Sequence, residues 1–193
     1  MDQVTPLSVT TLLVSLLAVF ISAIALYRAS FHRGRLRMTQ PTPILLSRDS
    51  RGLPKVSMMT MLFTTGNQGN IIESMYTVIR RGSTVLALPQ WSYSGGNKPG
   101  SAGLHVPSAG ISLQHEFVGA PDSSDFQFAP GDYLVETFAS PLTTKRGPVR
   151  LDRAALTIPA GVNVHNATGV MFTWLPSEKR YSPESISPTQ GIG

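Results

Sequence analysis

LSVTTLLVSLLAVFISAIALY, residues 7–27, is a run without a charged side chain, and RASFHRGRLR, residues 28–37, follows it directly. The second segment contains four arginines, which we call the collar: Arg28, Arg33, Arg35 and Arg37. At about 1.5 Å per residue, a helix over the first segment is roughly 30 Å long, the thickness of the hydrocarbon core of a bilayer. We therefore predict one transmembrane α-helix within residues 1–27, after a short N-terminal tail, and a basic juxtamembrane connector over residues 28–43.

The charge of the chain is concentrated in the collar. The 193 residues include 16 Lys and Arg against 11 Asp and Glu, and the collar accounts for four of the basic residues. A basic cluster beside a membrane helix is attracted to anionic lipid headgroups, so we favour these lipids over nucleic acid as its partner. The chain has no cysteine, which excludes disulfides, thiolate metal sites and a cysteine nucleophile, and fits a reducing compartment.

The apolar run predicts a permanent anchor, with a cleaved signal peptide as the alternative. A signal peptide has a basic start and a shorter apolar core, whereas only Asp2 is charged ahead of this run. Basic residues near a membrane span tend to stay in the cytoplasm, and all of them here follow the span. The sequence thus predicts a single-pass protein of an inner or plasma membrane, with its N-terminus outside and its C-terminal domain in the cytoplasm.

Hydroxyl side chains within the span are candidates for contacts with other membrane helices. Ser15 and Ser22 lie among small residues that permit close packing of helices. Their hydroxyl groups can equally well bond to the backbone of their own helix, and the sequence leaves both possibilities open.

An all-β domain is predicted over residues 44–175. Runs rich in β-branched and aromatic residues alternate there with Gly, Pro, Asn and Asp, a pattern typical of an antiparallel β-sandwich. The glycine-rich segment Ser94–Gly103 is predicted to be a long loop. We predict strands near residues 44–46, 56–65, 71–81, 84–93, 110–117, 126–128, 133–139, 149–158 and 168–175.

The most specific local pattern in this domain is Pro130-Gly131-Asp132-Tyr133. It resembles the corner of immunoglobulin-like sandwiches, where a tyrosine after such a turn bonds back to the backbone. The resemblance covers residues 128–139 and lacks the usual cysteines, and any Pro-Gly-Asp turn that enters a strand has the same letters. It implies an immunoglobulin-like architecture and no particular function.

Residues 176–193 are predicted to form an extended tail. Ser, Pro, Gly and Gln dominate this segment, and Pro183 and Pro188 disfavour regular structure. Such a tail would be disordered alone in water and ordered when it is held by a larger complex.

The sequence predicts no catalytic residue, metal ligand or cofactor. His32, His105, His115 and His165 have no metal-ligand spacing. The acidic residues Asp122, Asp125 and Asp132 lack the ligand order of a calcium loop. No Gly-x-Ser-x-Gly turn is present to expose a serine nucleophile.

These features predict a non-catalytic subunit that assembles or stabilises a larger membrane complex, with respiratory and photosynthetic complexes as candidates. Its partners would be integral membrane proteins and anionic headgroups. The predicted partner-binding residues are Ser15, Ser22, Trp91, Tyr93, Trp174 and Tyr181, although aromatic residues on strands also commonly belong to the core. One alternative is a tethered module that binds a peptide or soluble ligand at a strand edge or the glycine-rich loop. Another is an enzyme whose pocket would group His115 with Glu116 or Asp132.

Overall fold

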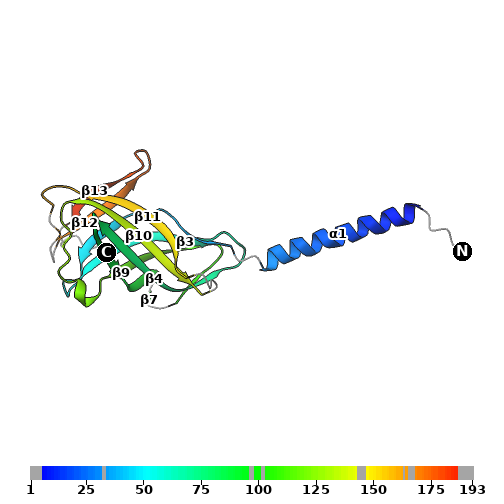
Figure 1. The fold of residues 1–193 in the computed structure, drawn as a ribbon, viewed down its shortest axis with the longest axis horizontal. Helices are drawn as coiled ribbons and strands as arrows, with labels where there is room; N and C mark the ends of the chain where they lie inside the picture. The colour runs from blue at the N-terminus through cyan, green and yellow to red at the C-terminus, as the bar shows by residue number, and fades with distance from the viewer. Residues whose placement is uncertain are drawn as a thin grey trace.

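The computed structural model describes residues 6–31, 34–95, 98–100, 103–142, 147–162, 164 and 168–186. An N-terminal helix, α1 (Pro6–Phe31), extends away from a β domain (Figure 1). The side chains of α1 between Val9 and Tyr27 are exposed, and this segment is long and apolar enough to cross a membrane once. The predicted apolar helix is therefore confirmed, and it continues through Arg28 to Phe31.

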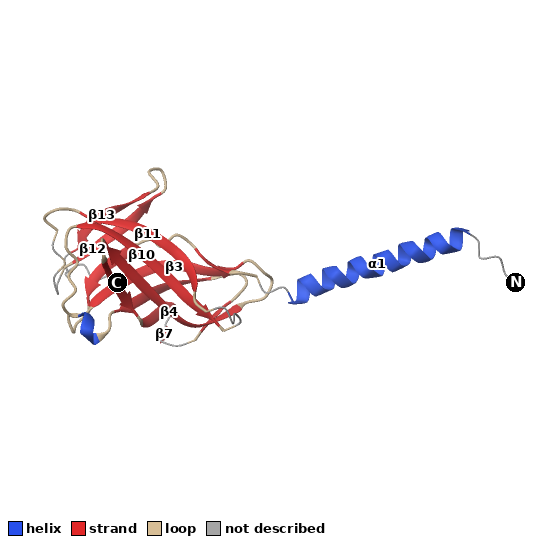
Figure 2. Cartoon of the chain, viewed as in Figure 1, coloured by secondary structure: helices blue, strands red, loops and turns tan. Residues whose placement is uncertain are grey.

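The β domain consists of two antiparallel sheets (Figure 2). The larger, eight-stranded sheet has the order β13-β12-β2-β3-β9-β6-β7, and β1 also pairs with β3. Its strands are β1 (Leu36–Met38), β2 (Ile44–Arg48), β3 (Pro54–Thr64), β6 (Gln90–Gly95), β7 (Lys98–Gly100), β9 (Ile111–Val118), β12 (Gly169–Leu175) and β13 (Arg180–Ile186).

The smaller, five-stranded sheet has the order β11-β10-β4-β5, and β8 also pairs with β4. Its strands are β4 (Asn70–Arg81), β5 (Thr84–Leu88), β8 (Leu104–Val106), β10 (Gly131–Pro141) and β11 (Val149–Ile158). The short 3-10 helix η1 (Pro121–Ser123) lies between β9 and β10. The core consists of the inward side chains of both sheets, including the fully buried Phe117 and Phe172 of the larger sheet and Ile79 of the smaller.

Two strand predictions were wrong. The segment 84–93 is not one strand: Pro89, which has no backbone N–H to donate, separates β5 of the smaller sheet from β6 of the larger. Residues 126–128 form no strand, because Phe126 and Phe128 pack their rings edge to face, 5.3 Å apart, and Phe128 fills the core.

The predicted tail contains a strand. Residues 180–186 form β13, which pairs with β12 over the whole length of both strands. Pro183 is accommodated because β13 is the outermost strand of its sheet, where a missing N–H leaves no ladder bond unmade. The domain boundary predicted after Leu175 therefore falls within the larger sheet, and residues 187–193 lie outside the described residues.

The hydrogen bond implied by the tyrosine-corner resemblance is present. The Tyr133 hydroxyl donates to the carbonyl oxygen of Ala129 at 2.6 Å. Tyr133 is 2% exposed, and its ring lies against that of Phe128. The bond ties the start of β10 to the loop before it.

A short, close junction joins the helix to the β domain. Gly34 packs so tightly on the backbone of Gly66 that a Cβ at position 34 would lie 1.9 Å from the Gly66 nitrogen. Beside it, the Arg35 N–H donates to Thr65 Oγ1 at 2.8 Å, and the Thr65 N–H donates to the Arg35 carbonyl at 3.0 Å. The chain that leaves α1 is thus fixed to the loop between β3 and β4.

Candidate interaction face of the smaller sheet

The outer face of the smaller sheet carries side chains that point away from the core. Alternate residues of a strand point to opposite faces, and Tyr133, Val135 and Thr137 of β10 are buried. Leu134, Glu136 and Phe138 therefore point outward, and their register partners on β4 are Arg80, Val78 and Tyr76. On the other side of β10, Glu136 pairs with Arg153 and Phe138 with Arg150.

Glu136 is held between two arginines on this face. Arg80 Nε lies 3.1 Å from Glu136 Oε2, and Arg150 donates from a terminal guanidinium nitrogen to Glu136 Oε1 at 3.0 Å. The hydrogen bond from Arg80, together with that from Arg150, lowers the pKa of Glu136 from its ordinary value. Arg153 is the register partner of Glu136 on β11, so this part of the face has three arginines and one glutamate and is positive.

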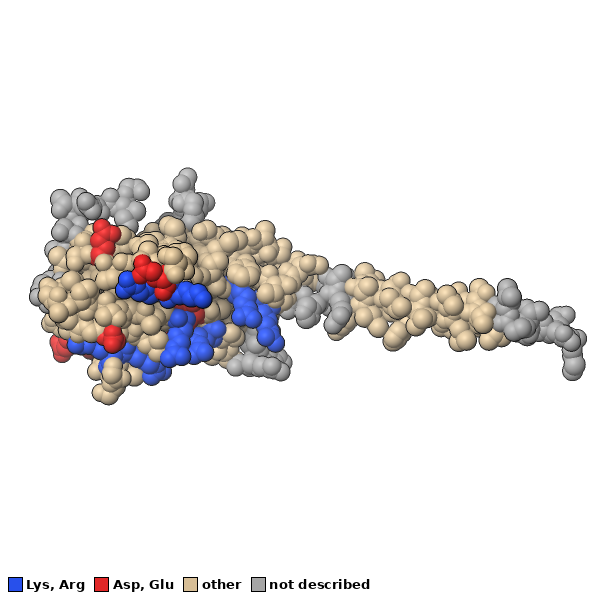
Figure 3. Space-filling model, turned by 90° about the horizontal axis from the view of Figure 1, so that it is seen from above, with Lys and Arg blue, Asp and Glu red and all other residues tan. Residues whose placement is uncertain are grey.

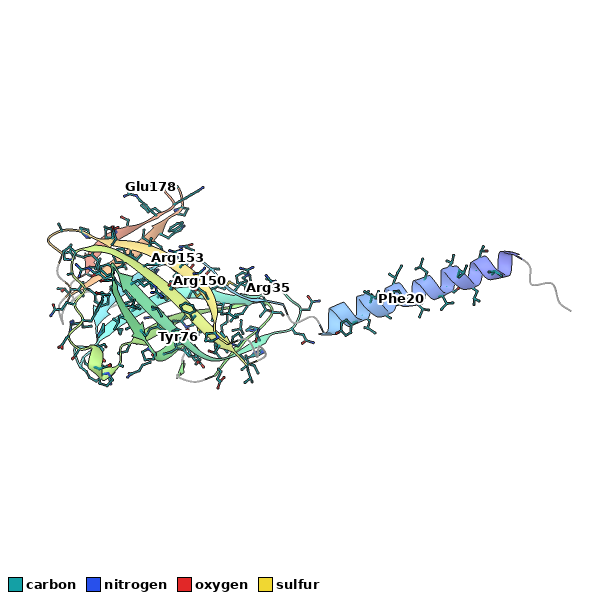
Figure 4. The ribbon with its side chains drawn as sticks, in the orientation of Figure 1. Phe20, Arg35, Tyr76, Arg150, Arg153 and Glu178 are labelled. Carbon is teal, nitrogen blue, oxygen red and sulfur yellow. The ribbon has the colours of Figure 1, made fainter. Side chains whose placement is uncertain are left out.

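Lys and Arg side chains lie along much of one side of the domain (Figure 3). Arg150 and Arg153 lie on β11, and Tyr76 lies on β4 (Figure 4). Arg80, Arg150 and Arg153 thus form a group of basic residues rather than an isolated ion pair.

Aromatic and aliphatic groups lie next to these arginines. The rings of Tyr76 and Phe138 stack with centroids 5.0 Å apart and planes inclined by 8°. Val78 lies beside this pair, and Val85 of β5 is 55% exposed. Arginine and aromatic residues are enriched in protein interfaces and supply most of their binding energy. We call the whole set the interaction face: Tyr76, Val78, Arg80, Val85, Glu136, Phe138, Arg150 and Arg153.

Strand β5 gives the smaller sheet an open edge. The hairpin between β4 and β5 is closed by the pair Arg81 and Thr84, so Thr84, Leu86 and Leu88 bond to β4. The backbone N–H and C=O groups of Val85 and Ala87 then point away from the sheet. Within the described residues no strand pairs with this side of β5.

The aromatic residues predicted to bind partners lie within or against the domain's own core. Trp91 is 7% exposed and donates its indole N–H to His115 Nδ1 at 3.1 Å. Tyr93 is half-buried and donates to the Gly103 carbonyl at 2.9 Å. Trp174 packs edge to face on Tyr181, whose hydroxyl donates to the Pro41 carbonyl at 2.7 Å. This packing favours the alternative that these residues stabilise the fold.

The helix residues of the prediction lie on an exposed surface. The Ser15 hydroxyl donates to the Thr11 carbonyl at 2.8 Å, within the same helix, and Ser22 is exposed. Of the collar, Arg35 and Arg37 are exposed, with Arg37 in β1. The side chain of Arg28 and the whole of Arg33 lie outside the described residues.

The candidate enzyme residues are not brought together. His115 points into the core, whereas Glu116 points outward and accepts a hydrogen bond from Lys55 Nζ at 3.1 Å. Asp132 accepts a hydrogen bond from Thr157 at 2.7 Å, and Asp122 lies in η1. Among the described residues, no three His, Asp or Glu side chains lie close enough to hold a metal ion.

No protein-family model and no curated protein matches this sequence.

Proposed function

We propose that this protein is a single-pass membrane-anchored, non-catalytic subunit that assembles or stabilises a larger membrane protein complex. The observation that carries the proposal is the interaction face, where Arg80, Arg150 and Arg153 flank a stacked aromatic pair on the smaller sheet. In this function α1 crosses the bilayer beside other membrane helices, and the face binds a partner subunit. A partner surface that combines acidic and apolar groups would complement this face.

The orientation belongs to the same proposal. The collar follows the apolar segment, which favours an N-terminus outside and a β domain in the cytoplasm, at an inner or plasma membrane. Respiratory and photosynthetic complexes remain candidates for the assembly.

We also propose that the domain is a divergent immunoglobulin-like sandwich. The hydrogen bond from Tyr133 to Ala129 supports this class. The eight-stranded and five-stranded sheets are larger than those of the usual immunoglobulin domain, so the likeness concerns the architecture around β10.

Extraction of the full chain in mild detergent at native abundance tests the proposal. The wild type should co-migrate with other membrane proteins, well above its own mass of 20.8 kDa. Replacement of Arg153, an exposed arginine of the face, by Glu should reduce the recovered partner by about tenfold or more, as for a central interface residue. Tyr76→Asp should have a similar effect. The readout is quantitative mass spectrometry of the co-purified proteins.

Thr173→Asp is the matched control, because Thr173 is an exposed residue on the larger sheet. It should leave the recovered partner unchanged. The proposal fails if the wild type migrates alone as a monomer, or if Arg153→Glu recovers as much partner as this control.

The open edge of β5 favours a second candidate function, a tethered module that binds an extended peptide. Such a peptide would add a strand to the sheet and bond to the outward N–H and C=O groups of Val85 and Ala87. Arg80, beside Val85 in the register, would favour an acidic segment.

Proline at position 85 separates the two candidate functions. The variant Val85→Pro removes an outward N–H and leaves the bonds of Thr84 and Leu86 to β4 in place. If the edge binds a peptide, the variant should lose about tenfold or more of the captured partner. If the flat face is the interface, Val85→Pro should lose far less of its partner than Arg153→Glu, because proline keeps an apolar side chain at this position of the face.

A further inference from the structure

Three exposed apolar side chains lie at the end of the domain where the helix joins it. Leu142 is 63% exposed, Ile71 43% and Val149 38%. The Leu142 N–H donates to the Ile71 carbonyl at 2.8 Å, so these two residues are adjacent. Val149 starts β11 and pairs with Ala139, near the end of β10. We call Ile71, Leu142 and Val149 the apolar rim.

The rim is close to the helix along the chain and in space. Ile71 is the second residue of β4, which follows the loop that contains Thr65 and Gly66, to which Arg35 and Gly34 are fixed. Figure 1 shows that β10 ends on the side of the domain that faces α1. From Phe31 to Gly34 the chain spans at most about 11 Å, since each residue adds no more than about 3.6 Å. A bilayer that contains α1 therefore lies within reach of this end of the domain.

Basic side chains accompany the rim. Arg35, just before β1, and Arg37, within β1, are exposed, and Arg150 follows Val149 on β11. Strand β1, which contains Arg37, lies against β11. Guanidinium groups bind lipid phosphates, and apolar side chains next to them enter the boundary between headgroups and acyl chains. The leucine and isoleucine of the rim thus suit the boundary between headgroups and acyl chains, and the arginines suit the phosphate layer above it.

We propose that the apolar rim docks the β domain onto the headgroup layer of the same bilayer that holds α1. This inference rests on the proposed function, because it requires α1 to be inserted. Leu142 and Ile71 lie in the interface of the membrane, Arg35 and Arg37 contact the phosphates, and the domain stands in one orientation on the surface.

Site-directed fluorescence tests this docking in the full chain. The protein has no cysteine, so a single introduced cysteine takes one environment-sensitive label without background. Three variants are reconstituted into vesicles of two parts phosphatidylcholine and one part phosphatidylglycerol: Leu142→Cys, Val85→Cys and Val19→Cys. Val85 is the matched control, because it is similarly exposed but lies next to the hairpin at the opposite end of β4. Lipids that carry a doxyl quencher report contact with the bilayer.

The label at position 142 should be quenched by doxyl lipid at least about twofold more than the label at position 85. The label at position 19, in the middle of α1, should be quenched strongly whether or not the rim docks. Quenching at 19 with equal, weak quenching at 142 and 85 would overturn the docking and leave the anchor intact. Weak quenching at position 19 would overturn the membrane anchor itself.

Discussion

A chain that ends at Leu175 should fail to form a stable β domain. This truncation removes β13, which pairs with β12 at the edge of the larger sheet and contributes Tyr181, a residue only 7% exposed. The Tyr181 hydroxyl donates to the Pro41 carbonyl and accepts a hydrogen bond from Gln40 Nε2, at 2.7 and 2.9 Å. Loss of a large buried aromatic side chain alone costs about 3–5 kcal/mol, a large part of the 5–15 kcal/mol that stabilises a typical domain.

Two truncations of the full chain separate the strand from the residues after it. The chain that ends at Ile186 keeps β13 and should retain the midpoint of thermal unfolding of the wild type, measured by circular dichroism in detergent. The chain that ends at Leu175 should show no cooperative transition and should be degraded quickly by a protease. Cooperative unfolding of the shorter chain near the wild-type midpoint would contradict a structural role for β13.

Acid should destabilise the domain through His115. This side chain is fully buried, and burial lowers its pKa from 6.5 to about 4. The unfolded chain therefore binds a proton on His115 at a pH where the folded domain keeps it neutral. The contribution of neutral His115 to the free energy of unfolding is fully present above pH 6.5. It falls as the pH drops toward 4, by about 1.4 kcal/mol per pH unit and about 3 kcal/mol in total.

The surroundings of His115 explain why a charge is costly there. Trp91 donates to Nδ1, so the neutral ring carries its proton on Nε2, which has no hydrogen-bond partner among the described residues. The ring of Phe117 lies on one side, with centroids 6.2 Å apart. No carboxylate in the described part of the chain is paired with this ring to offset a positive charge.

Denaturant unfolding between pH 7.5 and 4.5, followed by tryptophan fluorescence, measures the effect. His115→Gln should be less stable than the wild type at pH 7.5, yet lose about 3 kcal/mol less on acidification, because it has no proton to bind. His105→Gln is the control, since His105 is exposed on β8, and it should keep the wild-type pH dependence. An unchanged pH dependence in His115→Gln would show that other groups cause the acid sensitivity.

The sequence predicted the elements with strong local signals. The uncharged run before Arg28 predicts α1, and the alternation of Val170, Phe172 and Trp174 predicts β12, because both patterns depend on neighbouring residues alone. Strand β13 was missed because proline and serine are typical of loops, and Pro183 lies among serines. A strand tolerates this proline only because β13 is at the edge of its sheet, which the sequence does not show. The division at Pro89 was missed because nothing local shows that the chain changes sheets.

The interaction face could not be predicted, since it depends on register. Arg80 and Arg150 are 56 and 14 positions from Glu136 and meet it only through the pairing of β4, β10 and β11. One signal was present: Leu134, Glu136 and Phe138 stand at every second position of the predicted strand, and such positions share one face. The conspicuous aromatic residues Trp91 and Tyr181 instead fill the interior.

The brevity of the link between Phe31 and Gly34 has a consequence for how fast a complex would assemble. In the proposed membrane-anchored state, a domain on so short a link samples only a thin layer of solvent next to the bilayer, whereas a free domain explores the whole compartment. Partners confined to that layer then meet it by a two-dimensional search, at an effective concentration far above their bulk average. Under this confinement, a modest affinity of the smaller sheet for its partner is enough for the complex to form. Insertion of a long flexible spacer after Phe31 would lower the effective concentration of the domain near its partner and leave the contacts between them unchanged.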